Sequence, residues 1–317
     1  MRTNYPSVDI VVCGYRNREL TIQCIDSLLK LSYPNFKIIL VDDYSNDGTV
    51  EILREKYSRI TIIENKKNLG PARARNIGIK AGAGEYIVTM DNDATLSPDW
   101  LTKMIGLMKS DKKIGQAVGK ILFLDNPQKL AAAGGSMYFR GKAYDIGQGE
   151  PADSSRYGQK RNILFACTAS SIILRSALNY IGGFYDIYYH GYEDTDFSFR
   201  LNISGYGVVY YPEAVSFHIL SQTVSQKINK KRAYLAIRNR LLIMFRNYEF
   251  KSLIKYLPAN IKFSITDCLR HPERTVYVLK GWLWILFHFY GIFKSRKEIN
   301  RIRKSKDEQL YLLFNLV

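Results

Sequence analysis

The chain has 317 residues, of which 46% are hydrophobic and 24% charged, so it can bury a sizeable core as one large domain with an extension or as two domains. Its four cysteines form no C-x-x-C pair and have no histidine at metal-ligand spacing, which argues against a disulfide framework or a zinc site and fits a reducing compartment. The formal net charge of +17 at pH 7 indicates an anionic partner, which is a nucleic acid, a membrane surface or a phosphorylated substrate.

The first ninety residues alternate between strand and helix patterns. Apolar runs predict strands at 8–13, 36–41, 60–64 and 86–90, and helices are predicted between them at 19–31, 48–57 and 71–81. This alternation predicts a mainly parallel sheet with helices on both faces, whose ligands bind beyond the carboxyl ends of the strands. No secretory signal is expected, because the first apolar run is short and charged residues follow it at once. The protein is therefore expected in the cytoplasm.

The triplet Asp91-Asn92-Asp93 is the most informative short motif, because it stands at the end of the fourth predicted strand. Two carboxylates splayed by a turn at a strand's end can hold one divalent cation against the phosphates of a nucleotide. Taken alone, most such triplets are solvated turns or helix caps. Mg²⁺ and Mn²⁺ both suit oxygen ligands, so the motif does not choose between them.

The remainder of the chain changes character twice. Residues 119–163 have weak helix signals and several glycine turns, which predict a hairpin and a mobile loop. Helices are then predicted at 176–181 and 194–204, with a strand at 208–211 that ends at Pro212. Past His218 the sequence becomes helical, basic and aromatic, so we place a domain boundary between residues 1–222 and 223–317.

Taken in order, the motifs resemble those of family 2 nucleotide-sugar glycosyltransferases of the GT-A fold, in particular rhamnosyltransferase-like and cell-surface polysaccharide enzymes. The similar segments lie within about residues 6–220, at 11–19, 41–49, 68–76, 91–93, 182–184, 192–196, Arg200, 205–206, Pro212 and His218. The resemblance implies an α/β, Rossmann-like sheet flanked by helices, followed here by a helical, basic, aromatic C-terminal extension. It also implies an inverting, metal-dependent transfer of a sugar from a nucleoside-diphosphate sugar to an acceptor hydroxyl.

The resemblance assigns roles to matching residues around the strand ends. It implies nucleotide-sugar binding by Tyr15, Asp42, Asp43, Gly70, Arg75, Asn76, Asp91 and Asn92. It implies a Mg²⁺ or Mn²⁺ site made by Asp91, Asp93 and His218, in which Asp93 contacts the metal directly. Structural alternatives stay open, since residues 42–49 also suit a turn that caps a helix, 68–71 suit an ordinary helix start, and a lone histidine is more often a core or surface group. Tyr44 stands where the family often has glycine.

Three carboxylates, Glu193, Asp194 and Asp196, begin the helix predicted at 194–204. Acidic residues suit a helix start, but carboxylates this close together should also raise the pKa of at least one of them, as a general base requires. The resemblance implies that Asp194 takes the proton of the acceptor hydroxyl. It further implies acceptor or pyrophosphate contact by Glu193, Arg238 and Asn239, although a solvated helix face would explain the latter two. Asp196 and Arg200 are expected to form a supporting network on the helix.

The C-terminal region combines an aromatic stretch at 276–293 with a basic tail at 294–306, which has seven basic residues and one acidic residue. The apolar part, 282–293, is too short for a transmembrane helix, which needs about 20 apolar residues. With 241–245 and 253–257 it predicts a monotopic foot on an anionic membrane at the inner face of the cell membrane, and hence a lipid-linked glycan acceptor. The alternative is that these aromatics pack against the core or a second subunit.

Two other functions fit part of the sequence. A metal-dependent nucleotidyltransferase would also use such a sheet with acidic ligands, but residues 13–19 lack its glycine-rich, basic phosphate loop. A noncatalytic nucleotide-sugar-binding protein at a membrane surface stays open, although the intact set Asp91, Asp93, Asp194 and His218 argues against it. Nucleic-acid binding is not expected, because the basic excess follows aromatic helices and no groove-reading motif is present.

Overall fold

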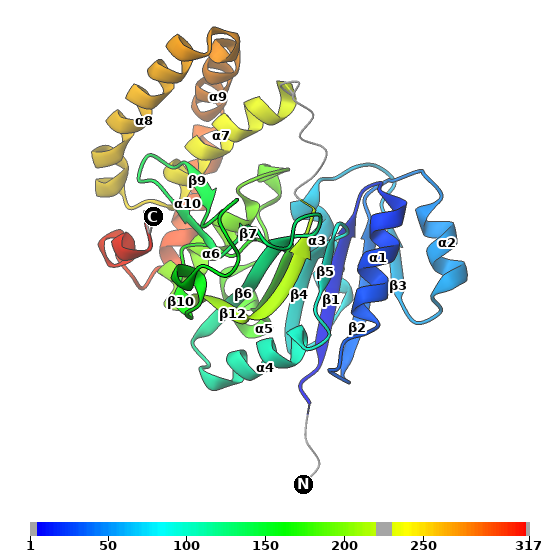
Figure 1. Cartoon of the computed structure of the whole chain (residues 1–317). Helices are drawn as coiled ribbons and strands as arrows, with labels where there is room; N and C mark the ends of the chain where they lie inside the picture. Colours follow the sequence, from blue (N-terminus) through cyan, green and yellow to red (C-terminus); the bar gives the residue numbers. More distant parts are fainter. Residues whose placement is uncertain (1–4, 220–229, 315–317) are drawn as a thin grey trace.

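The computed structural model of the chain describes residues 5–219 and 230–314. Within these residues a ten-stranded mixed sheet lies between helices, and the helices of the C-terminal third gather at one end of it (Figure 1). The strand order is β10-β12-β6-β11-β4-β1-β2-β3, with β5 beside β12 and β7 beside β6, while β8 and β9 form a separate two-stranded sheet. The predicted α/β fold class is confirmed.

The strands are β1 (Val8–Gly14), β2 (Phe36–Asp42), β3 (Thr61–Glu64), β4 (Tyr86–Asp91), β5 (Ala94–Leu96), β6 (Ile114–Phe123), β7 (Leu130–Ala132), β8 (Gly135–Met137), β9 (Ala143–Asp145), β10 (Arg161–Asn162), β11 (Ser170–Leu174) and β12 (Gly207–His218). The α-helices are α1 (Arg18–Leu28), α2 (Thr49–Lys56), α3 (Pro71–Ala81), α4 (Trp100–Ser110), α5 (Arg175–Ile181), α6 (Glu193–Ile203), α7 (Lys230–Asn247), α8 (Phe250–Arg270), α9 (Thr275–Phe287) and α10 (Phe289–Ile302). The elements predicted in the first ninety residues are all present, with ends shifted by a few residues at most.

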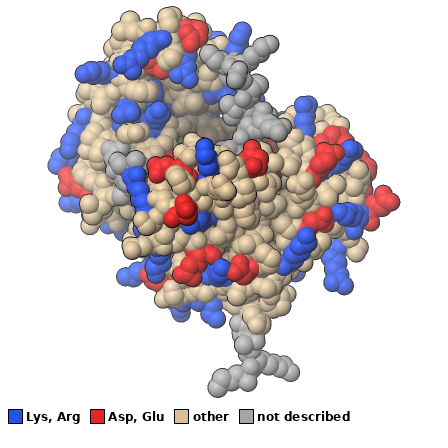
Figure 2. Space-filling view, viewed as in Figure 1, with Lys and Arg blue, Asp and Glu red and all other residues tan. Residues whose placement is uncertain are grey.

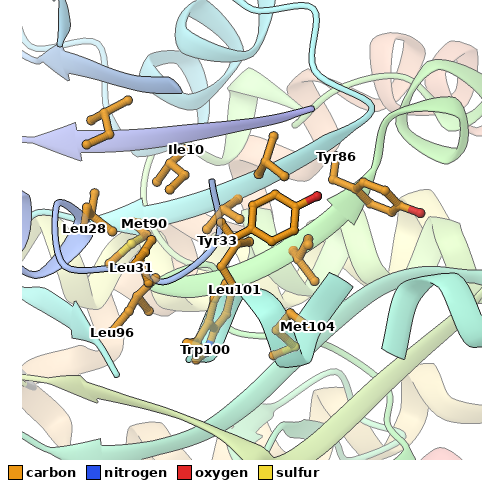
Figure 3. Close-up of a cluster of buried hydrophobic side chains, with 14 of the residues drawn as sticks. Ile10, Leu28, Leu31, Tyr33, Tyr86, Met90, Leu96, Trp100, Leu101 and Met104 are labelled. Atoms are coloured by element: carbon orange, nitrogen blue, oxygen red, sulfur yellow. The ribbon is translucent and has the colours of Figure 1, made fainter. Parts of the chain in front are cut away.

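The parallel strands β1 and β4 and most of β2 are buried on both faces, whereas β3, at the edge of the sheet, is partly exposed. Along β1, Ile10 and Val12 belong to one apolar cluster, while Val11 and Cys13, which point the other way, belong to a second cluster. Figure 3 shows the first cluster, in which the fully buried Trp100 of α4 packs beneath the sheet. Because helices cover both faces, ligands can reach these strands only at their ends, and their carboxyl ends meet at one edge.

The hairpin predicted within 119–163 is present as β8 and β9, and residues 146–160 connect it to β10 through turns and one short 3-10 helix. The mobility expected of the loop stays a prediction. One strand prediction needs correction. The strand predicted to end at Pro212 continues to His218 and pairs with β6 on both sides of residues 212–214. A register shift between Tyr211 and Val215 makes a bulge there, and a bulge tolerates proline because its amide need not join the ladder.

The C-terminal helices share a core with α6 and the β8–β9 hairpin. Ile243 of α7 and Phe314 belong to the same buried cluster as Phe199 of α6 and Met137 of β8. Residues 241–244 are fully buried, so this part of the predicted membrane foot is wrong. The predicted boundary at 222/223 lies outside the described residues.

Among the described helices, none alone is long and apolar enough to cross a membrane. The stretches 272–287 and 289–302 satisfy the length and composition criteria only as a pair, and the two are bent by 69° relative to each other.

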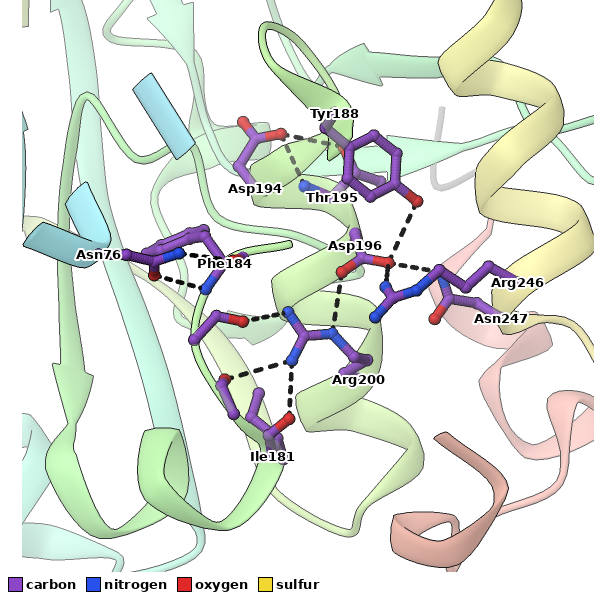
Figure 4. Close-up of polar contacts among 12 residues, drawn as sticks. Asn76, Ile181, Phe184, Tyr188, Asp194, Thr195, Asp196, Arg200, Arg246 and Asn247 are labelled. Atoms are coloured by element: carbon purple, nitrogen blue, oxygen red, sulfur yellow. Dashed lines mark hydrogen bonds and ion pairs between the residues drawn. The ribbon is translucent and has the colours of Figure 1, made fainter. Parts of the chain in front are cut away.

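One buried ionic network joins α6 to α7 and to the segment that precedes α6 (Figure 4). The fully buried Asp196 accepts hydrogen bonds from Arg200 Nε at 2.9 Å, Asn247 Nδ2 at 2.8 Å and the Tyr188 hydroxyl at 3.1 Å. It also forms an ion pair with Arg246 of α7. The supporting network expected for Asp196 and Arg200 is present and reaches further than one helix face.

Arg200 extends this network to the chain before α6, because it donates to the carbonyl oxygens of residues 181–183. Burial alone would raise the pKa of Asp196, but the charges of Arg246 and Arg200 outweigh burial and lower it to about 2. The ionised carboxylate is therefore the counter-charge that makes two buried guanidinium groups tolerable.

Replacing Asp196 by Asn should lower the free energy of unfolding by about 3–5 kcal/mol, since both arginines lose their counter-charge. The folded pKa lies below the unfolded value of about 3.8, so this contribution is complete above that pH and is lost as the pH falls towards 2. Urea unfolding of wild type and variant at neutral and acidic pH would measure both effects.

Asp99→Asn is the matched control, because the Asp99 and Lys103 side chains of its ion pair are 53% and 37% exposed. An exposed pair contributes about 1 kcal/mol or less. Similar losses of stability in the two variants would contradict the role assigned to Asp196.

Candidate functional site

Two aspartates and a histidine meet at the carboxyl edge of the sheet. Asp91 ends β4, Asp93 follows in the turn before β5, and His218 ends β12. One ligand atom from each lies within 4.8 Å of the other two, and His218 Nε2 is 3.0 Å from Asp93 Oδ1. The side chains of Asp91, Asp93 and His218 are 32%, 17% and 13% exposed, so an ion can reach them from solvent.

The pairing of β5 with β12 brings the histidine to the aspartates. His218 lies opposite Ala94, the neighbour of Asp93, and the amide of Ile219 donates to the Asp93 carbonyl at 3.1 Å. Burial alone would lower the pKa of His218, but its hydrogen bond to Asp93 and the charge of that carboxylate raise it. Two carboxylates and an imidazole converging on one point fit a divalent cation that takes its remaining ligands from a nucleotide.

Arg75 of α3 joins this metal cluster to the acidic start of α6. Its Nη2 donates to Asp91 Oδ1 at 2.6 Å, and its Nη1 donates to Glu193 Oε1 at 2.9 Å. The side chain is 3% exposed, and its Nε has no partner among the described residues. Burial alone would lower the pKa of Arg75, whereas Asp91 and Glu193 raise it, so the group stays charged. Arg75 thus positions two parts of the site.

Asp194 stands in the first turn of α6 and is half-buried. Its Oδ1 accepts a hydrogen bond from the amide of Thr195 at 2.6 Å. Burial, followed by the charges of Glu193 and Asp145, raises the pKa of Asp194 to about 7. A carboxyl group with such a pKa can take a proton from a ligand near neutral pH. Beside it, Glu193 Oε2 is buried and has no partner among the described residues.

Asp145 is a further carboxylate near the site, and the sequence analysis missed it. It ends β9 opposite Gly135 of β8 and is half-buried. Burial raises the pKa of Asp145 to about 6, against the opposing charge of His218. Its neighbours in the sequence form no motif, so only the folded hairpin shows that its charge acts on Asp194.

The two aspartates after β2 are engaged by nearby loops. Asp42 accepts hydrogen bonds from the Ser45 amide at 3.0 Å and from the Ser45 hydroxyl. Asp43 accepts from the amides of Leu69 and Gly70 at 2.9 and 2.8 Å. Both carboxylates are buried, so they fix the loops around the strand ends, and their contact with a nucleoside stays a prediction.

Two asparagines assigned to nucleotide binding also hold the chain in place. Asn92 Nδ2 donates to the carbonyl of Arg16 at 2.8 Å and so fixes the loop after β1. Asn76 donates to the Phe184 carbonyl at 2.7 Å and accepts from the Phe184 amide at 2.9 Å. These contacts explain both residues as structural supports, and their contact with a ligand stays a prediction.

Two tyrosine rings stand open at the loops that follow β1 and β2. Tyr15 is 42% exposed and Tyr44 is 45% exposed. Tyr44 has a φ of 72°, a conformation that glycine adopts without strain, which explains a preference for glycine there. Gly70 faces this edge as well, with a φ of +82°, and a Cβ on it would lie 2.6 Å from the Tyr189 carbonyl oxygen.

Arg238 and Asn239 of α7 are buried under the segment that precedes α6. Arg238 Nη2 donates to the carbonyl of Ile187 at 2.6 Å, and Asn239 Nδ2 donates to the carbonyl of Gly191 at 2.7 Å. The solvated helix face considered as their alternative is therefore wrong. Their observed role is to hold residues 187–191, and their contact with pyrophosphate or acceptor stays a prediction.

Residues 9–182 match the model of the family Glycosyl transferase family 2. A poly-beta-1,6-N-acetyl-D-glucosamine synthase from Staphylococcus epidermidis is 26% identical over 232 residues, which are 68% of this chain and 51% of the synthase. An uncharacterized glycosyltransferase from Haemophilus influenzae is 34% identical over 122 residues, which are 38% of each protein. The chain therefore spans about half the length, or less, of these relatives.

Solved structures show the same fold. GalNAc-T7 with UDP, GalNAc and Mn²⁺ has a TM-score of 0.64 at 15% identity, covering 80% of this chain and 50% of that protein. A mannosyltransferase from Pyrobaculum calidifontis with GDP-Man and Mn²⁺ has a TM-score of 0.59 at 17% identity, covering 95% and 86%. TarS 1-349 from S. aureus with UDP-GlcNAc has a TM-score of 0.57 at 16% identity, covering 96% and 91%.

Replacing Asp93 by Asn should weaken Mn²⁺ binding by more than the roughly 10- to 100-fold that loss of a residue supporting a metal ligand costs. Titration with Mn²⁺ in the absence of nucleotide, with the free ion followed by electron paramagnetic resonance, would measure this. Asp47→Asn is the control, because Asp47 binds the Thr49 amide at 3.1 Å in a neighbouring loop. Equal affinities of wild type and Asp93→Asn would contradict the metal site.

Proposed function

The chain belongs to glycosyl transferase family 2, and we propose that it moves a sugar from a nucleoside-diphosphate sugar to an acceptor hydroxyl with inversion at the anomeric carbon. The observation that carries this proposal is the Arg75 bridge, which holds the metal cluster and the Asp194 region in one site. The donor is supported by the sugar nucleotides bound in the similar structures. A nucleotidyltransferase gains no support from the family match.

In the proposed mechanism the metal cluster faces the diphosphate and Asp194 faces the acceptor. A bound Mg²⁺ or Mn²⁺, held by Asp91, Asp93 and His218, supplies positive charge where the nucleoside diphosphate leaves. Asp194 takes the proton of the acceptor hydroxyl while that oxygen forms its bond to the anomeric carbon. The bond from that carbon to the diphosphate oxygen breaks in the same step, and a single displacement inverts the configuration.

The nucleoside is proposed to lie over the loops after β1 and β2. Tyr15 and Tyr44 offer exposed rings there, and Asp42 and Asp43 keep the loop backbones fixed beneath them. Aromatic side chains suit a flat base, because they bury area with little loss of conformational entropy. Glu193, whose Oε2 lacks a partner among the described residues, is proposed to meet the acceptor or the sugar.

We propose a lipid-linked glycan as acceptor and a position at the inner face of the cell membrane. Helix α8 supports this, because it leaves a stripe of large apolar side chains exposed, hereafter the α8 stripe: Phe250, Ile254, Ile261, Ile265 and Leu269. Exposed apolar residues continue on α9 and α10, and Lys251, Lys262 and Lys280 are exposed near them. Apolar side chains flanked by lysines suit a headgroup layer of anionic lipids. The four cysteines are free, which suits the cytoplasm.

Replacing Asp194 by Asn should abolish transfer while Mn²⁺ and nucleotide binding remain, because only the proton acceptor is removed. In wild type the rate should rise with pH through about 7, since the carboxylate is the active form. Transfer from UDP-, GDP- and dTDP-sugars, with binding of the corresponding nucleotides measured by calorimetry, would check both. Glu213→Gln, an exposed acidic residue away from the site, is the control. Full turnover by Asp194→Asn would remove Asp194 from the mechanism.

Replacing Ile265 and Leu269 together by Ser should reduce binding to anionic vesicles by about tenfold or more, because both side chains lose apolar area. Vesicle flotation would measure the bound fraction. Leu29→Ser is the control, since Leu29, which directly follows α1, is 49% exposed and lies outside the α8 stripe. Unchanged binding of the double variant would refute the membrane foot. Deleting α9 and α10 is a poorer test, because Ile285 and Ile292 belong to the core.

A further inference from the structure

An open cavity of about 340 Å³ lies between the turn that joins β8 to β9 and the outer half of α8. Its wall holds four residues that are or can become cationic, namely Arg140, Lys262, Arg270 and His271, and one acidic residue, Asp267. We call it the cationic pocket. The proposed sugar transfer does not use it.

The guanidinium of Arg140 is held in the cationic pocket by ring faces. Its Cζ lies 4.2 Å from the Tyr138 ring centroid and 5.0 Å from the Phe263 centroid. Its Nε is buried and has no hydrogen-bond partner among the described residues. Aromatic faces support a cation from above and below while its N–H groups in the plane stay open to an anion.

Arg240 of α7 places a second guanidinium behind this wall. It is only 5% exposed, lies 4.5 Å from the Phe263 ring centroid, and donates from Nη2 to Ser264 Oγ at 3.1 Å. Its Nε is buried and unpartnered within the described part of the chain. Asp267 pairs with Arg274 at 3.1 Å, and among the described residues neither Arg140 nor Arg240 forms an ion pair with it.

The charge balance of the pocket is therefore incomplete. Burial lowers the pKa of Arg240, and the nearby charges of Arg140 and Arg274 lower it further, against the opposing effects of Tyr192 and Asp267. A buried charge is costly unless an opposite charge and hydrogen bonds compensate it. A bound anion would supply both.

The cationic pocket is built by the fold and does not need to form around a ligand. Asn260 of α8 donates to the carbonyl of Arg140 at 2.7 Å, which fixes the turn against the helix. Gly141 has a φ of +85°, and a Cβ on it would lie 2.8 Å from the Arg240 carbonyl oxygen. The turn therefore packs directly on α7 and α8, and Arg140 has a defined place.

The position of the pocket connects it with the proposed reaction. From the turn that holds Arg140, β9 leads back to Asp145, whose charge acts on Asp194. The Ala143 amide donates a hydrogen bond to the hydroxyl oxygen of Tyr192 at 3.3 Å. Tyr192 directly precedes Glu193. Lys262 and Arg270 of the pocket wall directly follow Ile261 and Leu269 of the α8 stripe, so the wall and the stripe occupy adjoining faces of α8. In Figure 2 Lys and Arg side chains gather over the end of the molecule where α8 and α9 lie in Figure 1.

We propose that the cationic pocket binds a phosphate or diphosphate group, and that the adjoining α8 stripe makes the phosphate of a lipid-linked acceptor its source. This inference rests on the proposed function, because it names the part of the acceptor that anchors it. The larger cavity beside α1, of about 570 Å³, shows no such imbalance, since its charged residues are Asp26 and Lys30. Arginine suits phosphate because its planar donors match the oxygens.

The test compares vesicles of phosphatidylcholine that contain either a polyprenyl monophosphate or phosphatidylglycerol, matched in surface charge. Wild-type protein, freed of metal by EDTA, should bind the monophosphate vesicles about tenfold more tightly, and Arg140→Gln should lose that preference. Lys255→Gln is the matched control, because Lys255 lies on the same helix, is exposed and is outside the pocket wall. Arg270→Gln, an exposed residue of the wall, replaces Arg140→Gln if the latter does not fold.

The outcomes separate the sources of phosphate. Equal binding of wild type to both kinds of vesicle, together with no competition by inorganic pyrophosphate, would overturn the pocket. An equal loss of preference in Lys255→Gln would overturn it as well. Competition by pyrophosphate without any vesicle preference would support the anion site and overturn the lipid as its source. Asp194→Asn should keep the preference, so failure of the proposed transfer reaction and failure of the pocket can be told apart.

Discussion

Arg75 lies between two groups of carboxylates that would otherwise repel each other. Asp91 belongs to the metal cluster and Glu193 to the start of α6, and each accepts a hydrogen bond from the same nearly buried guanidinium. Removing one partner of such a buried arrangement leaves uncompensated charge, which costs several kcal/mol. The relation between the strand ends and α6 is therefore set by electrostatics as much as by packing. Every distance across the proposed site depends on it.

The fold delivers these groups by different routes. Strand β4 brings Asp91, the long β12 carries His218 past a bulge to the same edge, and α6 is held in place by the Asp196 network. Several polar residues around them, such as Asn76 and Asn92, donate hydrogen bonds to backbone carbonyls and so fix loops. These fixed loops hold the few half-exposed side chains of the site in position without support from a ligand.

Much of this arrangement could be predicted from the sequence, and the rest could not for identifiable reasons. The parallel strands were predictable because apolar runs with acidic ends alternate with amphipathic segments. Pro212 misled the strand prediction, because a bulge is a property of paired strands and leaves no local signal. Asp145 has no motif around it, and the burial of residues 241–244 follows from packing against α6 and α10. The sequence shows that Arg140 is charged, but only the folded structure shows that its Nε is buried without a hydrogen-bond partner among the described residues.

The core that the C-terminal helices share with α6 and the β8–β9 hairpin has a consequence for biosynthesis. Phe199, on the helix that carries Asp194, is packed in one cluster with Leu310 and Phe314. On a ribosome the strands and α6 would be made well before those residues, so the cluster would stay open on one side during translation. A nascent chain can thus hold the complete motif set and still lack the support of α6. The proposed site would therefore gain its full support only after Leu310 and Phe314 have packed against Phe199.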